Sequence, residues 1–286
     1  MVSFGDQEQI SRFIQQALQE DKFKDDITTS LVIPAGLITE AVIEARQEGI
    51  PAGLDICRQV FTAVDHKLDI RLFCKDGDSV RTGDIVARIR GSAWSILRAE
   101  RTALNILGWM SGIATLTRQF VEQVKGSGAL ICDTRKTTPT LRMFEKYAVR
   151  AGGGHNHRMN LADGVLIKDN HLNVLRATGK TLGEAAALAR NSAPEGIKVE
   201  VEVTSYEEAL EVAAAGVDVI LLDNMAAAEM KRVAEALSGR VKLEASGGIT
   251  LENVAEVGAT GVDYISIGAL THSAKNMDFS LEIASY

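Results

Sequence analysis

The chain has 286 residues, of which 46% are hydrophobic, and a formal net charge of −7 at pH 7. This length suits one large barrel-type domain, or a barrel with a smaller domain. The acidic balance argues against a general nucleic-acid binder, which needs a basic face. No apolar run approaches the roughly 20 residues that span a membrane. We therefore expect a globular cytoplasmic protein that binds neither nucleic acid nor membrane.

The first 110 residues mix helical and strand patterns. Residues 6–20 and 54–64 carry apolar positions at helical spacing, and 95–110 form a strong amphipathic pattern that includes Arg101. Short apolar or alternating runs predict strands at 41–46, 68–74 and 85–89. Residues 111–115, which begin Ser-Gly, are expected to lead into a second domain.

After residue 112 strand and helix patterns alternate. Strands are predicted at 129–132, 164–168, 198–203, 217–222, 241–245 and 262–267, with helices at 141–148, 181–190, 206–214, 226–237 and 250–257. Such alternation, with nearly continuous apolar strands, predicts a parallel sheet covered by helices. Six strands are too few for a complete eight-stranded barrel. An incomplete barrel is predicted, with an open doubly wound sheet as the alternative.

Polar residues or glycines follow every one of these predicted strands. In a parallel barrel the carboxyl ends of the strands converge on one face, where such folds keep their sites. A site is therefore predicted from the residues at these ends, which are Arg135 and Lys136, Lys168, Glu202, Asp223, Ser246 to Gly248, and Gly268.

The residue types at these ends indicate a polyanionic ligand. An Arg fork suits a carboxylate, and a Lys ammonium suits phosphate. Glycines at 247, 248 and 268 would let backbone N–H groups approach phosphate. The loop 152–158 adds His157 and Arg158 after three glycines. The acids at 202 and 223 suit sugar hydroxyls, or Mg²⁺ bound with phosphates. A phosphorylated sugar with a second polyanionic substrate fits this set.

Several longer motifs resemble the quinolinate phosphoribosyltransferase family, also called nicotinate-nucleotide pyrophosphorylase (carboxylating). They occur in family order over nearly the whole chain. The motifs are Glu-Arg-Thr-Ala-Leu-Asn (100–105), Ser-Gly-Ile-Ala-Thr (111–115), Asp-Thr-Arg-Lys-Thr-Thr-Pro (133–139), Gly-Gly-Gly-x-Asn-His-Arg (152–158), Leu-Ile-Lys-Asp-Asn-His (166–171), Val-Glu-Val-Glu (199–202), Leu-Leu-Asp-Asn (221–224), Glu-Ala-Ser-Gly-Gly-Ile-Thr (244–250) and Asp-Tyr-Ile-Ser-Ile-Gly (263–268).

The resemblance implies a fold, an activity and an assembly. The fold would be α/β, with an N-terminal α/β sandwich domain over 1–112, completed by the tail at about 273–286, and an incomplete α/β barrel over 113–272. The activity would be transfer of phosphoribose from 5-phosphoribosyl 1-pyrophosphate to quinolinate with decarboxylation. The products are nicotinate mononucleotide, pyrophosphate and CO₂, in NAD biosynthesis. The family forms homodimers with shared active sites, and in some cases hexamers.

The resemblance also implies roles for individual residues. Those that would hold the quinolinate carboxylates are Arg101, Arg135, His157, Arg158 and Lys168. Those with catalytic roles on the phosphoribosyl and Mg²⁺ side would be Lys136, Glu202 and Asp223, the two acids meeting the metal directly or through substrate and water. Those around phosphate would be Ser246, Gly247, Gly248, Gly268 and His272.

Three other functions compete with this interpretation. One is a related phosphoribosyltransferase with a different acceptor, such as the molybdenum-locus paralogue. Another is a barrel aldolase that uses Lys136 or Lys168 as a Schiff base, although such a lysine needs a lowered pKa. The third is a non-catalytic phosphosugar sensor. Turnover of quinolinate separates the first interpretation from all three.

Overall fold

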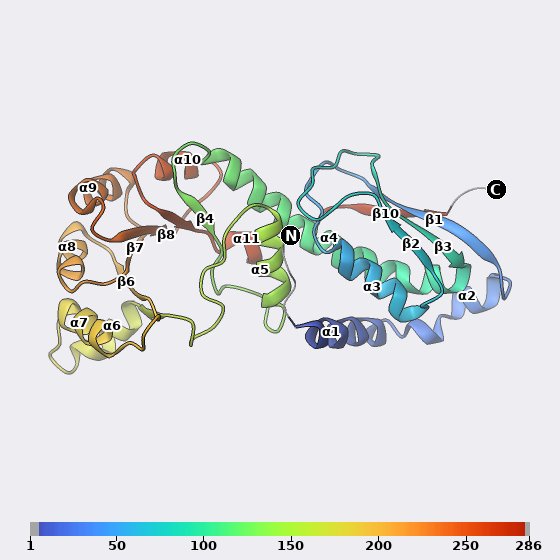
Figure 1. The fold of residues 1–286 in the computed structure, drawn as a ribbon, viewed down its shortest axis with the longest axis horizontal. Coiled ribbons are helices and arrows are strands. Elements are labelled where there is room, and N and C mark those ends of the chain that lie inside the picture. The colour runs from blue at the N-terminus through green and yellow to red at the C-terminus, as the bar shows by residue number, and fades with distance from the viewer. Residues whose placement is uncertain (1–5, 284–286) are drawn as a thin grey trace. The chain divides into compact units, whose positions relative to one another are not determined.

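The computed structural model describes residues 6–283 and divides the chain into two compact units (Figure 1). Within the described residues, the first unit comprises 6–118, Met143–Gly153 and 273–283, and the second comprises Gln119–Arg142 and Gly154–His272. Among the described helices none has the length and apolar character needed to cross a membrane.

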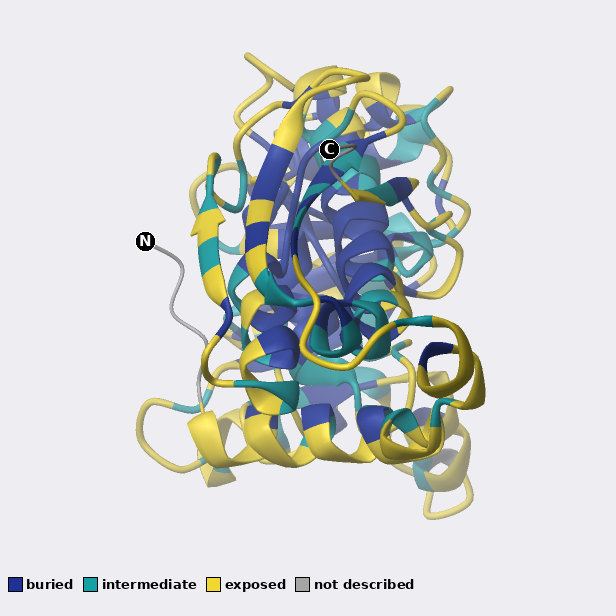
Figure 2. Ribbon diagram, turned by 90° about the vertical axis from the view of Figure 1, so that its right-hand side faces the viewer, coloured by how far each residue is buried: buried dark blue, intermediate teal, exposed yellow. Residues whose placement is uncertain are grey.

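The first unit contains a four-stranded antiparallel sheet in the order β10-β1-β3-β2. Its strands are β1 (Ile38–Ala45), β2 (Asp69–Leu72), β3 (Ile85–Ser92) and β10 (Phe279–Ile283). Burial alternates along β1, as expected for a sheet with one face on a core (Figure 2). Because β10 pairs with β1, the C-terminal segment completes this sheet, as the resemblance implied.

Helices supply the other layer of the first unit. They are α1 (Gln7–Glu20), α2 (Ile27–Val32), α3 (Leu54–Val64) and most of α4 (Ala93–Gln123), with a 3₁₀ turn, η1, at Phe23–Asp25. Asp6 caps α1 by accepting a hydrogen bond from the Glu8 N–H at 2.9 Å. Fully buried apolar residues of α3 and α4, such as Phe61 and Leu107, contribute to the core.

Helix α4 is longer than its sequence pattern predicted. The predicted end at residue 110 is wrong, since the helix continues to Gln123 and residues 111–115 lie inside it. Gly112 does not break the helix. A Cβ on this residue would lie 2.1 Å from the Lys275 carbonyl oxygen, so glycine allows the chain before β10 to approach the helix. The glycine reflects packing between segments far apart in sequence.

Helix α5 (Arg142–Ala151) follows a strand of the second unit, but nearly all of it belongs to the first. The Phe144 ring lies 4.4 Å from the Phe13 ring of α1, measured between centroids. The Tyr147 hydroxyl donates to Asp76 Oδ2 at 2.6 Å, and the same carboxylate accepts the N–H groups of Gly53 and Leu54 at the start of α3. The helix predicted over 141–148 is therefore present, but it does not cover the parallel sheet as the alternation suggested.

The second unit contains a six-stranded parallel sheet in the order β4-β9-β8-β7-β6-β5. Its strands are β4 (Leu130–Cys132), β5 (Val165–Ile167), β6 (Val199–Val203), β7 (Val219–Asp223), β8 (Lys242–Ser246) and β9 (Tyr264–Ser266). From β5 to β9 each strand pairs with the next in the chain, so right-handed crossovers place the helices on one face. The order never reverses as in a doubly wound sheet. Because β4 and β5 form unpaired edges of this sheet, the result is the predicted incomplete barrel.

Five helices of the second unit cover the outer face of this sheet (Figure 1). They are α6 (Asp169–Arg176), α7 (Leu182–Ser192), α8 (Tyr206–Ala214), α9 (Ala227–Leu237) and α10 (Val254–Gly258), whereas α11 (Ala269–His272) follows β9 at its carboxyl end. Sequence patterns predicted four of these positions but not α6 or α11, which are short and follow directly on the polar residues after β5 and β9.

Gly112→Ala should destabilise the first unit because its methyl group cannot fit against the Lys275 carbonyl without a backbone shift. We expect a loss of about 1–3 kcal/mol in the free energy of unfolding, measured by chemical denaturation. Gly164→Ala is the control, since its added Cβ would meet only the Lys198 carbonyl oxygen at 3.6 Å. Equal stability of the two variants would contradict the close approach at Gly112.

Candidate active site

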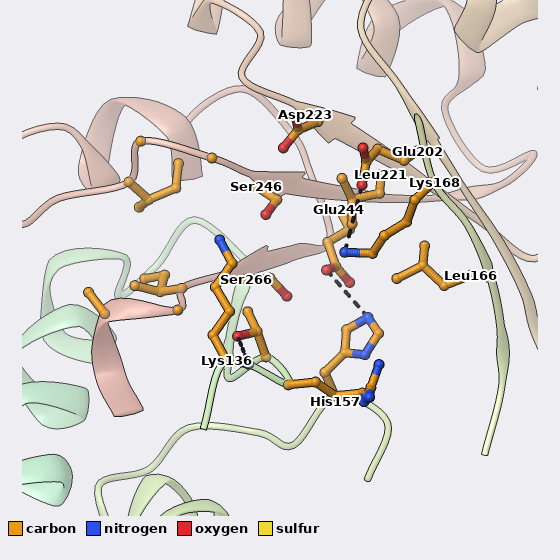
Figure 3. Close-up of a pocket in the computed structure, with 18 of the residues that line it drawn as sticks. Lys136, His157, Leu166, Lys168, Glu202, Leu221, Asp223, Glu244, Ser246 and Ser266 are labelled. Atoms are coloured by element: carbon orange, nitrogen blue, oxygen red, sulfur yellow. Dashed lines mark hydrogen bonds and ion pairs between the residues drawn. The ribbon is translucent and has the colours of Figure 1, made fainter. Parts of the chain in front are cut away.

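A cavity of about 510 Å³ lies within the second unit at the carboxyl ends of the parallel strands (Figure 3). All the predicted site residues except Arg101 line it. They are Arg135, Lys136, His157, Arg158, Lys168, Glu202, Asp223, Ser246, Gly247, Gly248, Gly268 and His272. Arg101 lies on α4 in the first unit, where its side chain is 66% exposed and 4.0 Å from Glu100. The sheet thus brings together residues from seven separate stretches of sequence.

Cations form one wall of this cavity. Arg135 Nε is buried and has no hydrogen-bond partner among the described residues. Arg158 Nη1 donates to the Gly164 carbonyl at 3.0 Å. Burial, and then the neighbouring Arg135 charge, lower the pKa of Arg158. Two guanidinium groups held this close need an anion to balance them, so this wall is suited to a ligand with carboxylates.

The buried carboxylate of Asp133 positions the loop that carries His157 and Arg158. Residue 155 pairs with Cys132 in a parallel bridge, so the loop runs beside β4. Asp133 Oδ2 accepts from Asn156 Nδ2 at 2.6 Å, and Oδ1 accepts the His157 N–H at 2.9 Å. The His157 and Arg158 side chains are therefore directed by the edge strand, not by the glycines that precede them.

His157 contacts two carboxylates that sequence reasoning did not assign to the site. Its Nε2 lies 3.0 Å from Glu200 Oε2 and 3.5 Å from Glu244 Oε1. Its Nδ1 accepts the N–H of Arg158 at 2.8 Å, so the neutral ring carries its proton on Nε2. His157, Glu200 and Glu244 lie close enough together to hold a metal ion, but a protonated Nε2 has no lone pair to offer a metal and instead donates to Glu200 Oε2.

Glu200 and Glu244 are acids within apolar strands, and that pattern was the signal available in the sequence. Each lies between apolar residues in the middle of a predicted buried strand, and both are buried in the structure. Burial first, and then the Glu200 carboxylate, raise the pKa of Glu244 to about 7, although His157 partly opposes this. Glu244 lines the cavity beside Arg158 and Lys168, whereas Glu200 does not.

A second pair of acids lies at the ends of adjacent strands. Burial, followed by repulsion from Asp223, raises the pKa of Glu202, while Lys168 lowers it. The Lys168 ammonium is 4.0 Å from Glu202, and Asn224 Nδ2 donates to Asp223 Oδ2 at 2.8 Å. Two facing carboxylates suit a divalent cation that keeps water and phosphate ligands, or the hydroxyls of a sugar. This donor set fits Mg²⁺.

Glycines at the remaining strand ends allow close packing. Gly247 has φ +88°, and a Cβ there would lie 2.4 Å from Asn224 Oδ1. A Cβ on Gly268 would lie 3.0 Å from Lys136 Cδ and 3.1 Å from His272 Nε2. The Thr271 hydroxyl donates to the Lys136 carbonyl at 2.7 Å, which fixes that backbone beside β9. Bare backbone, a lysine and a histidine at one end of the cavity suit phosphate.

Glu244→Gln should remove a pH dependence of stability. The Glu244 pKa rises from an ordinary 4.5 to about 7 on folding, so the folded state holds a proton that the unfolded state loses. That contribution is complete below pH 4.5 and is lost as the pH rises through 7. From pH 5 to 8 the unmodified protein should lose up to about 3 kcal/mol more unfolding free energy than the variant.

Denaturant titrations at each pH measure this difference, with the exposed Glu207→Gln of α8 as the control. Parallel pH profiles for the unmodified protein and Glu244→Gln would show that the Glu244 carboxyl does not hold a proton in this range.

Comparisons with known proteins agree with the geometry. The family model described as "Quinolinate phosphoribosyl transferase, C-terminal domain" matches residues 113–282, and the corresponding N-terminal domain model matches 26–111. A Bacillus subtilis protein named "Probable nicotinate-nucleotide pyrophosphorylase [carboxylating]" is 43% identical over 96% of this chain and 93% of its own length. The Mycobacterium leprae nicotinate-nucleotide pyrophosphorylase is 41% identical over 94% of this chain and 95% of its own length.

Solved structures show the same fold. NadC from Streptococcus pyogenes has a TM-score of 0.91 at 41% identity, covering 99% of this chain and 100% of that one. The nicotinate-nucleotide pyrophosphorylase of Francisella tularensis has a TM-score of 0.91 at 34% identity, covering 98% of each chain. The sequence, the two-unit fold and the matched domains agree, and the chain belongs to the quinolinate phosphoribosyltransferase family.

Proposed function

We propose that this protein transfers phosphoribose from 5-phosphoribosyl 1-pyrophosphate to quinolinate and releases CO₂. The products are nicotinate mononucleotide and pyrophosphate, and the reaction serves NAD biosynthesis in the cytoplasm. The observation that supports this most directly is one cavity that joins a cationic wall, two facing acids and a glycine-rich end. Membership of the quinolinate phosphoribosyltransferase family indicates which substrates this cavity would bind.

Quinolinate would bind at the cationic wall. Its two adjacent carboxylates match the pair of guanidinium groups at 135 and 158, with His157 and Lys168 completing the wall. The buried Arg135 Nε has no hydrogen-bond partner in the part of the chain that the structure describes, and such a ligand would supply one. The fixed orientation of this planar acid would then point its ring nitrogen toward the sugar.

The phosphoribosyl group would bind between Lys136, the acids at 202 and 223, and the glycine-rich end. As pyrophosphate leaves, positive charge develops on the ribose, and Glu202 and Asp223 stabilise that charge and orient the hydroxyls. Lys136 neutralises charge on the departing phosphates. Mg²⁺ held by the two acids, directly or through water, would supply further neutralisation of pyrophosphate. Ser246 and His272 would contact phosphate with the glycines.

Decarboxylation follows from the first step. Once the pyridine nitrogen carries ribose it is positively charged and withdraws electrons from the neighbouring carbon that bears the 2-carboxylate. The protein's part is to hold the ring and exclude water. The rival paralogue activity would use a different acceptor, so release of CO₂ distinguishes the two.

An assay of quinolinate turnover tests the proposed function. Purified protein with 5-phosphoribosyl 1-pyrophosphate and Mg²⁺ should form equal amounts of CO₂ and nicotinate mononucleotide from quinolinate, measured by chromatography and radiolabelled CO₂. Nicotinate is the control acceptor, which should give little product because it lacks the second carboxylate. Absence of both products from quinolinate would refute the proposal.

Arg135→Lys should lower kcat/KM for quinolinate by at least about 100-fold although the charge is kept. An ammonium cannot reproduce the two parallel hydrogen bonds of a guanidinium to a carboxylate. Steady-state kinetics measures the effect, and Arg240→Lys at an exposed position outside the cavity is the control. Near-normal kcat/KM in the Arg135 variant would contradict the assigned role.

Chelation of Mg²⁺ should stop turnover reversibly. Without a cation, Glu202 and Asp223 would face the pyrophosphate charge directly. Activity should vanish in excess EDTA and return on addition of Mg²⁺, with Ca²⁺ as the comparison metal. Full activity in EDTA would show that the two acids act without a metal.

We also propose that the active unit is a homodimer, or a hexamer made of three such dimers, in which Arg101 completes the partner's site. Arg101 does not line the cavity of its own second unit, yet it lies in a family motif and its side chain is largely exposed. A cation exposed on an amphipathic helix can bind an anionic ligand that is held in the site of another subunit.

Arg101→Ala and Lys136→Ala should each be inactive alone but regain partial activity as a mixed dimer. Such a dimer would contain one intact site and one doubly damaged site. Differentially tagged copies, co-expressed and purified through both tags, allow the measurement. Mixed dimers that fold and pair but stay as inactive as the single variants would show that Arg101 acts within its own chain.

A further inference from the structure

The proposed reaction needs a proton that none of the roles above supplies. When CO₂ leaves the ribosylated ring, the electron pair of the broken C–C bond stays on ring carbon 2. That carbon must then form a C–H bond. The inference below rests on the proposed function and concerns the origin of this proton. Arginines do not give up protons in proteins, and the lysines are needed as cations, so a neutral acid is required.

Glu244 is a carboxyl in the right part of the cavity. It lies on β8, near the middle of the sheet, and lines the cavity together with Arg158 and Lys168 of the wall proposed for quinolinate. Leu166 and Leu221 line the same cavity, and the ends of the His157 and Lys168 side chains point toward the Glu244 carboxyl (Figure 3). Its side chain is nearly fully buried, and its Oε1 makes no hydrogen bond to any described residue.

The surrounding charges favour a neutral Glu244. One imidazole proton, on Nε2 of His157, faces two buried carboxylates, and the Glu200 oxygen is the nearer at 3.0 Å. Glu244, the other carboxyl, is left without a charged partner at hydrogen-bond distance. Keeping its proton therefore costs less free energy than ionising. Burial, Glu200 on β6 and Asp133 after β4 oppose its ionisation, whereas His157 and the Ser266 hydroxyl favour it.

Other charged and polar groups also face Glu244. Arg158 and Lys168 line the same cavity and would favour ionisation, but the proposed dicarboxylate ligand would neutralise them. Strand β9 contributes Ser266 and Tyr264, and β7 contributes the apolar Leu221. Substrate binding would therefore strengthen the preference for a protonated carboxyl.

A second cavity, of about 360 Å³, gives Glu244 a separate connection to solvent. It lies at the amino ends of the strands, where it is lined by the first residues of β4, β5, β7 and β9. Its lining includes the exposed residues His155, Asp163 and Lys198. Glu244 lines both cavities. Water could therefore reach the carboxyl from this side while substrate fills the other.

We propose that the Glu244 carboxyl donates the proton that ring carbon 2 takes when CO₂ departs, and that water in the second cavity restores it. The C–C bond breaks, its electron pair remains on carbon 2, and the O–H bond of Glu244 breaks as the C–H bond forms. The carboxylate left behind takes a proton from solvent. No electron transfer or further reactant is needed.

Glu244→Gln tests the proposal because it keeps the shape of the side chain and removes the acid. In a single turnover, pyrophosphate release should stay within about 3-fold of the unmodified rate. Conversion of ribosylated quinolinate to nicotinate mononucleotide should slow by about 100- to 1,000-fold, so that the dicarboxylate intermediate accumulates. Quenched samples separated by chromatography give both rates. Glu244→Asp, which keeps an acid, should restore part of the second rate.

The pH dependence provides a measurement that a purely structural role would not change. The decarboxylating step of the unmodified protein should slow as the pH rises and Glu244 ionises, whereas that of Glu244→Gln should be slow and flat. Glu200→Gln is the matched control, because it keeps the donor and removes the neighbouring charge. Its decarboxylating step should persist with the midpoint moved to lower pH.

Several outcomes would overturn the inference. Nicotinate mononucleotide formed from the intermediate at the unmodified rate in Glu244→Gln would exclude Glu244 as the donor. Equal slowing of pyrophosphate release and product formation would show that Glu244 acts only by positioning His157. If the Gln variant does not fold, a pH-independent step in the unmodified protein between pH 5 and 9 refutes the proposal. An unmodified protein that releases no pyrophosphate from the two substrates would instead refute the proposed function.

Discussion

The buried carboxylate of Asp133 is the interaction on which the site depends. It follows β4 and binds both the Asn156 side chain and the His157 backbone. The loop of residues 155–158 is thereby held along an edge of the incomplete barrel, where a closed barrel would have another strand. The missing closure gives this loop access to the interior. His157 can then reach Glu200 and Glu244, which lie on interior strands.

Charge balance connects this arrangement to the chemistry. The cavity contains cations that are not fully neutralised and, beside them, acids whose pKa values are raised by burial and by one another. Burying any one of these charges alone costs free energy. A ligand of opposite charge or a shared proton offsets that cost. A dicarboxylate, a phosphorylated sugar and a divalent cation together satisfy this balance. The same burial that makes the site costly strengthens its electrostatics during reaction.

Predictions from the sequence succeeded where a property is local or repeats along the chain. Strand and helix alternation predicted the parallel sheet, and the polar strand ends predicted which residues meet, from Arg135 through Gly268. They failed at Gly112, where glycine marked a close approach inside a helix and not a boundary. They also failed to place α5, because the partners of Phe144 and Tyr147 lie more than 70 residues away in sequence.

The sequence by itself determined the six parallel strands, four of the helices between them and the family, because hydrophobic periodicity and the residues at strand ends can be read from consecutive positions. Only the tertiary structure decided the pairing of His157 with Glu200 and Glu244, and the position of Glu244 between two cavities. An acid in an apolar strand has the same local pattern whether it is exposed at an edge or buried inside a barrel. Its pKa depends on neighbours from other strands, and only folding brings those neighbours together.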